Sequence, residues 1–469
     1  MIFPLMLAAL TATASAHHTV STSDPLAQQL FDRGLTSFYA YDRAGAADAF
    51  ANALQQDPHL AMAAWGQALA VASDLNHPLT PEFFAAAQSA VKHAVAVEQY
   101  ASAPERAYID ALALRYAGSW DAHETDEQRY SQAMNAIIAQ APLDDDAATL
   151  EAEALLEDHE PAATALALLQ PVLQRHPLNL MANHLCVHAY DALADRTPAI
   201  ICADRLSTMT FLPQDEHLAH MPAHTYSETG RYAKAVAASE RAWALRTAWN
   251  AGARPYELQY GTHDAGVGYA AAMMLGDLSL AQTWAARFSD QSESSTQLTT
   301  LARFGKWSQI AALPAQPDSH KAFALGLAYA HLGYLNAANQ QLNDLRGARP
   351  DSDYLYILQA VVDERRGDIG SAASSLRRAI AIQERDYTAE YIPLFPAGEA
   401  LGALYNRAGR YSDARAALQD SLARYPGDPR ALYALAFACG KIADAPCATT
   451  SNTAFSAIWP EPPPSMTDF

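Results

Sequence analysis

The sequence predicts an all-α fold, an α-solenoid of antiparallel helix pairs that stack one on the next. A pattern of small residues, large apolar residues and a closing proline recurs in units of about 34 residues. A chain of 469 residues would ordinarily divide into about three domains, yet no Gly/Ser-rich linker or low-complexity run interrupts this one. A solenoid explains both observations, because each repeat contacts mainly its neighbours.

The repeat pattern is clearest near the C-terminal end of the chain. There it comprises Leu401, Gly402, Tyr405, Gly409, Ala414, Leu418 and Pro426. Three further windows keep the same frame: Gly326, Tyr329, Gly333, Ala338, Leu342 and Pro350; Gly34, Ala46, Phe50, Ala53 and Pro58; and Gly367, Ala372, Leu376 and Ala379. The small residues let two helices approach, the large ones fill the space between them, and the proline ends the second helix. This is the pattern of the tetratricopeptide repeat.

The same frame extends into a histidine-rich region between residues 184 and 263. Its three repeats are anchored on Ala199 and Ala203, on Tyr226, Gly230, Ala235 and Ala242, and on Gly276 and Ala281. The frame assigns the six histidines of the region to the first helix of each repeat, at places two, five and nine: His184, His188, His217, His220, His224 and His263. Since these places are spaced i, i+3 and i+7, they form one stripe on the helix face.

The shared stripe makes a transition-metal site the main functional hypothesis. Imidazoles at i and i+4 chelate one ion from one helix face, and histidine ligands suit copper, iron or zinc, of which copper is favoured here. Six imidazoles exceed what one ion requires, so we expect one or two ions. Asp191 lies on the same helix as His184 and is the candidate general base or ligand-orienting residue. A metal-free groove that binds an acid or phosphate, and a purely structural cluster, remain as alternatives.

The chain also resembles a bacterial, often exported group of tetratricopeptide-repeat proteins. The resemblance rests on the runs A-N-H-L-C-V-H-A-Y, H-L-A-H-M-P-A-H-T-Y, R-F-G-K-W and L-G-A-L-Y-N-R-A-G-R-Y, and it covers about residues 30–433. It implies that the histidine stripe lines the concave groove in which such arrays bind ligands. The sequence departs from the group's pattern at Asp264, at Ala322–Leu325 and around Glu390–Ala397. These departures concern substrate contacts and leave the histidines unaffected.

The N-terminal region has the character of a secretory signal. Residues 1–16 form an apolar run that ends in A-S-A, which resembles a signal peptide, so we expect a periplasmic or secreted protein. Cleavage after Ala16 would leave His17 as an N-terminal residue, which can bind copper through its amine and ring. We expect a flexible segment at 17–26, a continuous solenoid at 27–455 and a frayed Pro-rich tail at 456–469.

Charge, hydropathy and cysteine content bear on the partners, the membrane spans and the disulfides of the chain. The chain has 51 acidic and 31 basic residues and a net charge of −20, which argues against nucleic acid as a partner. No segment has the roughly 18 consecutive apolar residues of a membrane span. Four cysteines allow three pairings, and Cys186 with Cys202 and Cys439 with Cys447 are favoured because each pair would join neighbouring helices.

Two function classes therefore stay open. In the first, the protein is an exported metalloprotein that acts on a small molecule in its groove, as an oxidoreductase more readily than as a hydrolase, because hydrolase signatures such as H-E-x-x-H and G-x-S-x-G are absent. In the second, it is an adaptor that binds a peptide or partner protein in the groove without catalysis.

Overall fold

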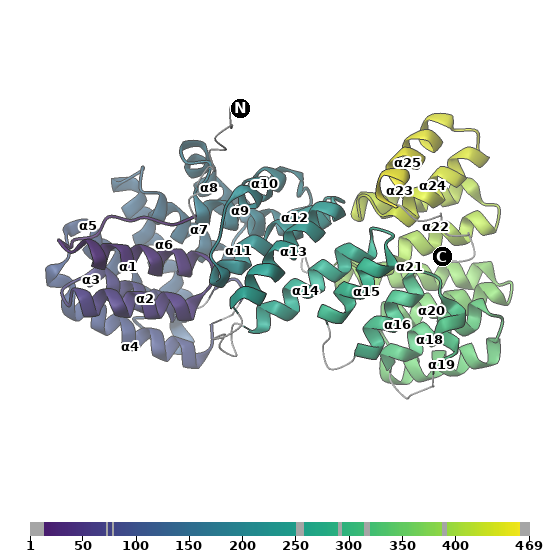
Figure 1. Cartoon of the computed structure of the whole chain (residues 1–469), viewed down its shortest axis with the longest axis horizontal. Helices are drawn as coiled ribbons and strands as arrows, with labels where there is room; N and C mark the ends of the chain where they lie inside the picture. Colours follow the sequence, from purple (N-terminus) through teal and green to yellow (C-terminus); the bar gives the residue numbers. More distant parts are fainter. Residues whose placement is uncertain are drawn as a thin grey trace, which may run out of the picture. The chain divides into compact units, whose positions relative to one another are not determined.

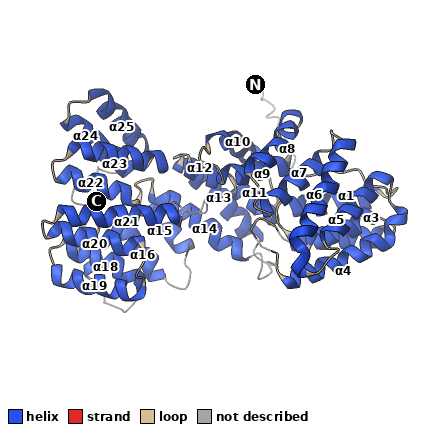
Figure 2. Cartoon of the chain, turned by 180° about the vertical axis from the view of Figure 1, so that it is seen from behind, coloured by secondary structure: helices blue, strands red, loops and turns tan. Residues whose placement is uncertain are grey.

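The computed structural model is all-helical (Figures 1 and 2). It describes residues 14–71, 74–76, 79–249, 258–288, 293–313, 319–386 and 392–459, and within these ranges it has no β-strand. The predicted fold class is confirmed. No helix in the described ranges is long and apolar enough to cross a membrane.

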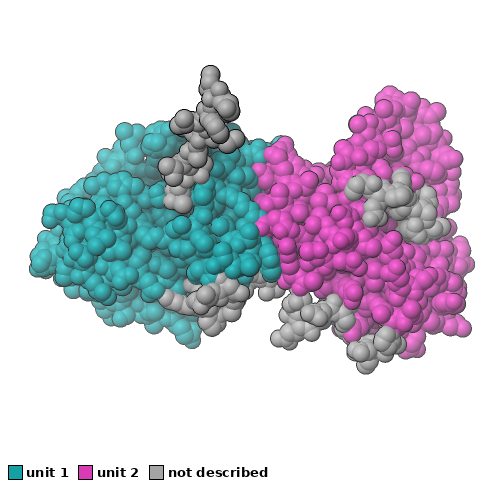
Figure 3. Space-filling view, viewed as in Figure 1, with its two compact units in different colours: residues 1–222, 241–257 teal, residues 223–240, 258–469 magenta. Residues whose placement is uncertain are grey.

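The chain divides into two compact units, drawn in different colours in Figure 3. Unit 1 comprises residues 1–222 and 241–257, and unit 2 comprises residues 223–240 and 258–469. The helices of unit 1 are α1 (Pro25–Tyr39), α2 (Arg43–Gln56), α3 (Ala61–Ala70), α4 (Pro81–Val97), α5 (Ala103–Arg115), α6 (His123–Gln140), α7 (Asp145–Glu157), α8 (Ala162–Arg175), α9 (Leu180–Asp191), α10 (Ile200–Thr208) and α11 (Glu216–His220). Short 3₁₀ turns are η1 (Glu98–Tyr100), η2 (Trp120–Ala122), η3 (Thr197–Ala199) and η4 (Pro213–Asp215).

The remaining helices belong wholly or partly to unit 2. Residues of α12 (Pro222–Glu228) and α13 (Tyr232–Trp249) are divided between the units. Unit 2 continues with α14 (Leu258–Met273), α15 (Leu278–Arg287), α16 (Glu293–Arg303), α17 (Trp307–Ala311), α18 (Ser319–His331), α19 (Leu335–Ala348), α20 (Asp353–Arg365), α21 (Ile369–Arg385), α22 (Ala397–Arg407), α23 (Tyr411–Arg424), α24 (Pro429–Lys441) and α25 (Ala445–Ile458).

Consecutive helices pair as the repeat frame predicts. In unit 1, α1 packs on α2, α3 on α4, α5 on α6 and α7 on α8, and in unit 2, α18 packs on α19, α20 on α21 and α22 on α23. Gly402 shows why a small residue is needed, because a Cβ there would lie 2.2 Å from Cγ of Leu418 on the partner helix. Gly409 follows α22 with φ +71°, the left-handed conformation that glycine adopts most easily at a helix end.

A network of four buried charges lies in the interior of unit 2. Arg303, from the R-F-G-K-W run, donates to Glu399 at 2.6 Å and to Asp428 at 3.2 Å. Arg430 completes the network, with Nε 3.4 Å from Glu399 and Nη1 2.8 Å from the carbonyl oxygen of Arg303. Two cationic side chains thus face two carboxyl groups, and this pairing offsets the cost of burying them.

The structure shows how the N-terminal segment and the tail pack within their own units. We expected residues 17–26 to be flexible; in the structure, Ser21 N donates to Glu105 Oε1 at 2.6 Å and Thr22 Oγ1 to Asp57 Oδ2 at 2.6 Å. Of the Pro-rich tail expected at 456–469, residues 456–458 end α25, and Trp459 is buried beside Gly276. The rest of the tail and most of the apolar N-terminal run lie outside the described residues.

Both favoured disulfides are present in the structure. Cys186 on α9 is bonded to Cys202 on α10, and Cys439 on α24 to Cys447 on α25. Each bond joins two consecutive helices, which is the arrangement that the short sequence separations of 16 and 8 residues predict.

Candidate metal centre

Helix α9 carries the first two predicted ligands. Asn179 caps its N-terminus by accepting from Ala182 N at 2.9 Å. His184 and His188 are four residues apart and therefore lie one above the other on one face of the helix. Cys186 lies between them in sequence and bonds to α10, so the disulfide and the histidines occupy different faces. This bond holds the helix that positions both imidazoles.

The third predicted ligand that approaches them, His217, comes from the short helix α11. Two ion pairs hold the start of that helix. Arg33 on α1 donates to both oxygens of Asp215, at 2.8 and 3.1 Å, and Arg246 donates to Glu216 at 3.1 Å. A helix of five residues has little stability of its own, so these contacts fix the backbone next to His217.

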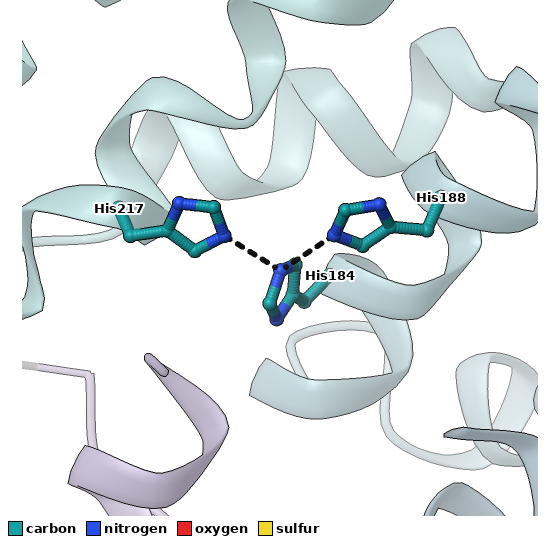
Figure 4. Close-up of side chains that lie close together, drawn as sticks. All are labelled: His184, His188 and His217. Atoms are coloured by element: carbon teal, nitrogen blue, oxygen red, sulfur yellow. Dashed lines mark hydrogen bonds between the residues drawn. The ribbon is translucent and has the colours of Figure 1, made fainter. Parts of the chain in front are cut away.

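The Nε2 atoms of the three side chains converge (Figure 4). His184 Nε2 lies 3.1 Å from His188 Nε2 and 3.2 Å from His217 Nε2. Nitrogen ligands at about 2.0–2.1 Å from a tetrahedral ion would be separated by about 3.3 Å. We call these three residues the histidine trio. Its spacing is close to that of a three-histidine coordination shell.

The backbone carbonyl of Tyr39 sets the tautomer of His184. Nδ1 of His184 lies 3.0 Å from the carbonyl oxygen of Tyr39. Because a carbonyl only accepts, Nδ1 carries the proton, and Nε2 of the neutral ring carries a single lone pair. That one lone pair faces both His188 and His217, so it can accept a hydrogen bond at good geometry from only one of them. A cation at the centre would instead receive one lone pair from each ring.

Tyr41 closes one side of the histidine trio. Its ring centroid lies 4.6 Å from that of His184, 6.2 Å from that of His188 and 5.4 Å from that of His217, on which it stacks. Tyr41 is 1% exposed and has φ +57°, a left-handed conformation that costs a bulky residue about 1–2 kcal/mol. Strain of this kind persists where the surrounding packing imposes it, commonly beside a functional site.

The other three predicted ligands divide between the units. His224 and His263 both belong to unit 2, where their Nε2 atoms are 3.1 Å apart and their rings stack at 5.1 Å. His220 belongs to unit 1; it is fully buried, and its ring centroid lies 6.4 Å from that of His217. Of the six histidines in the single stripe read from the sequence, unit 1 therefore contains the trio and His220, and unit 2 contains His224 and His263.

Asp191, the candidate base, is the last residue of α9. Its backbone carbonyl accepts from Arg196 at 3.3 Å. Among the described residues, the group of potential ligands formed by the trio does not include Asp191. Its role as a base or ligand-orienting residue stays a prediction.

Sequence reasoning missed the residues around the trio. Tyr39 and Tyr41 lie about 145 residues before His184, and Asp215 with Arg33 joins segments 182 residues apart. No local pattern in the run S-F-Y-A-Y-D signals a role beside histidines. Only the position of Tyr41 directly after the end of α1, where glycine or asparagine is usual, could have drawn attention to it.

A further group of potential ligands combines His18 with Asp144 and Asp146. His18 Nδ1 lies 2.7 Å from Asp146 Oδ2, and the phenols of Tyr39 and Tyr108 donate to Asp146 and Asp144 at 2.6 and 2.8 Å. Burial lowers the pKa of His18, but the hydrogen bond and charge of Asp146 outweigh it and leave that pKa raised. The contact between His18 and Asp146 ties the N-terminal segment to the first turn of α7.

Comparisons with known proteins address the repeat. A family model described as tetratricopeptide repeat matches residues 396–438, which span α22, α23 and most of α24, so the repeat predicted in that window is confirmed. No curated protein matches the chain. The crystal structure of the APC/C hetero-tetramer Cut9-Hcn1 is similar to it at 11% identity and a TM-score of 0.32, covering 77% of this chain and 80% of that one.

Proposed function

We propose that this chain, which carries a tetratricopeptide repeat, binds a transition metal through His184, His188 and His217. The observation that carries the proposal is the convergence of three Nε2 atoms, with separations of 3.1 and 3.2 Å from the central one. The hydrogen bond that His184 Nδ1 donates to the carbonyl oxygen of Tyr39 is the contact that a metal-bound histidine ordinarily makes through its other nitrogen.

The donor set favours copper, with iron or zinc as the next choices. Neutral imidazoles suit these three metals, whereas magnesium and calcium require oxygen ligands. The group formed by the trio contains histidines alone. Copper binds a given nitrogen site more tightly than the other divalent metals of its row, so it is the first candidate where it is present.

Three histidine ligands leave a fourth coordination position for water or a substrate, as in catalytic rather than structural sites. With copper or iron in place, the chemistry available is redox chemistry on a small molecule, and we propose an oxidoreductase on that basis. His224 and His263 supply two ligands of a second candidate site in unit 2. We accordingly expect one or two ions, in a protein exported to the periplasm or the medium.

An adaptor function is the alternative, and the match of residues 396–438 to the tetratricopeptide repeat favours it. In that case the groove would bind a peptide or partner protein, and the histidines would act as polar contacts. Metal content separates the two proposals, because an adaptor has no need of a bound ion.

The test is elemental analysis of the untagged protein after exhaustive dialysis, for copper, iron, zinc, manganese and nickel. We expect one or two equivalents of copper or iron; zinc would support the site but move the chemistry towards hydrolysis. The double variant His224→Ala/His263→Ala should keep the ion held by the trio and lose any second one. Wild-type protein that retains no metal, even after reconstitution with each ion, would refute the metal proposal and leave the adaptor.

A further inference from the structure

Unit 2 contains a cavity of about 370 Å³ that the metal proposal does not use. It lies among α14, α20, α21 and the segment 392–394. A cavity of this size exceeds the space of a single water by roughly tenfold and falls in the range of sites that bind small organic groups. The side chains of its walls therefore determine which ligand fits.

Three aromatic side chains form much of the wall, and contacts behind the cavity hold two of them. Tyr269 stacks on Phe288 with centroids 5.8 Å apart, and its hydroxyl lies 2.9 Å from Thr300 Oγ1. Tyr354 stacks on Phe323 at 4.4 Å. These contacts hold Tyr269 and Tyr354 in place. The aromatic rings therefore form a rigid apolar wall, and such rings have electron-rich faces.

The polar part of the wall is a carboxylate held in a defined position. Asp353 Oδ2 accepts from Gln383 Nε2 at 2.9 Å, and Asp353 Oδ1 accepts from Tyr354 N at 2.8 Å. Gln383 is itself held, because it donates to Phe395 O at 2.9 Å and accepts from Ala397 N at 2.9 Å. Asp353 Oδ1 also accepts from Ser352 Oγ at 3.4 Å. The carboxylate is thus preorganised, and Oδ2 keeps a further acceptor position.

The charge of this wall has one sign. The lining residues that the structure describes include Asp353 and Asp386 and no Lys, Arg or His. Asp386 is exposed and engaged by Arg385 at 2.6 and 2.8 Å, so Asp353 supplies the charge that a ligand would meet. The net charge of −20 on the whole chain adds a long-range attraction for cations.

We propose that this cavity binds an organic cation, an ammonium or guanidinium group carried on an apolar stem. The cation would pair with Asp353, while the stem and the charge would lie against the aromatic rings, which attract cations through their faces. Such a group comes either from a free amine or from the lysine or arginine side chain of a peptide. This inference does not depend on the metal proposal.

Calorimetric titration of the full-length protein, freed of metal by chelator dialysis, tests the inference. The probes are hexylamine, agmatine and the uncharged hexanol, together with a five-residue peptide carrying a central arginine and the same peptide with glutamine there. We expect saturable binding of the cations and at least about tenfold weaker binding of hexanol, since a charge-assisted hydrogen bond is lost. Tighter binding by the arginine peptide than by the free amines would identify a peptide ligand, and the reverse order a small amine.

Two variants locate the binding. Asp353→Asn keeps the shape of the side chain and should weaken cation binding about tenfold or more. Asp363→Asn is the matched control, because Asp363 lies on the same helix α20 and also accepts from a glutamine, Gln359, at 2.9 Å, but does not line the cavity. Equal binding of amine and alcohol, equal affinities of the two variants, or no saturable binding of any cation would overturn the inference.

Discussion

Replacing His188 with alanine tests the metal centre with little damage to the fold. His188 is only partly buried, whereas His184 is fully buried and donates to the carbonyl of Tyr39. Truncation at position 188 therefore opens the site towards solvent rather than leaving a closed cavity, the change that costs most in a core. We expect the far-ultraviolet circular dichroism of the metal-free variant to match that of the wild type.

The expected loss of affinity follows from the number of ligands. Zinc sites with four protein ligands bind with about 10–16 kcal/mol, so each ligand contributes about 3 kcal/mol. The histidine trio offers three imidazole nitrogens, one from each ring, within 4.8 Å of one another. Removing one of them should weaken binding about 100-fold, since about 1.4 kcal/mol corresponds to a factor of ten.

Competition against a chromogenic chelator measures this loss directly. His93→Ala is the matched control, because His93 is an exposed histidine on α4 in the same unit, and its removal should leave the affinity unchanged. The reasoning would be refuted if the His188 variant bound metal as tightly as the wild type, or if the control lost as much affinity.

Three further predictions concern stability. Replacing Cys186 and Cys202 with serine removes a bond that closes a loop of sequence separation 16 and should lower the free energy of unfolding by about 3 kcal/mol. Without reductant, a melting temperature lower in the variant than in the wild type would verify it, and equal melting temperatures would contradict it. Arg303→Met leaves two buried carboxylates without their central cation and should lower the free energy of unfolding, measured with urea, by about 3–5 kcal/mol. An unchanged free energy of unfolding would contradict a stabilising role of Arg303. Asp146 raises the pKa of His18 in the folded state. The stability that His18 contributes to the fold is therefore fully present below the unfolded pKa of about 6.5, and it is lost as pH rises through the folded pKa. His18→Ala should flatten this part of the stability profile, and an unchanged profile would exclude His18 as its source.

Local pattern was sufficient to predict the helices, their pairing and the faces they share. The frame through Gly402, Gly409 and Leu418 placed small residues where α22 and α23 meet, because a repeat contacts mainly its neighbours and leaves a periodic trace in the sequence. The same reasoning placed His184 and His188 on one face of α9, since i and i+4 coincide on any helix. The two disulfides followed in the same way from short separations.

The grouping of the histidines depended on the tertiary structure. A repeat frame specifies which face a residue occupies, but the distance between residues of different repeats depends on how far each repeat rotates and rises relative to the last. The Nε2 atoms of His184 and His217 thus meet at 3.2 Å, while the contact between His224 and His263 forms in the other unit. The spacing of the histidines in the sequence does not show which of them meet within one unit.

The sequence by itself determined an all-α repeat chain with a histidine-rich face, because helical period and repeat spacing are local properties. Tertiary structure alone decided what surrounds that face. Tyr39 reaches His184 from α1 across 145 residues, and Tyr41 contacts the same ring from just beyond the end of that helix. Arg33 reaches Asp215 from α1. Contacts of this kind arise when distant helices fold back on one another, and since nothing repeats in them, they leave no period for a reader of the sequence to find.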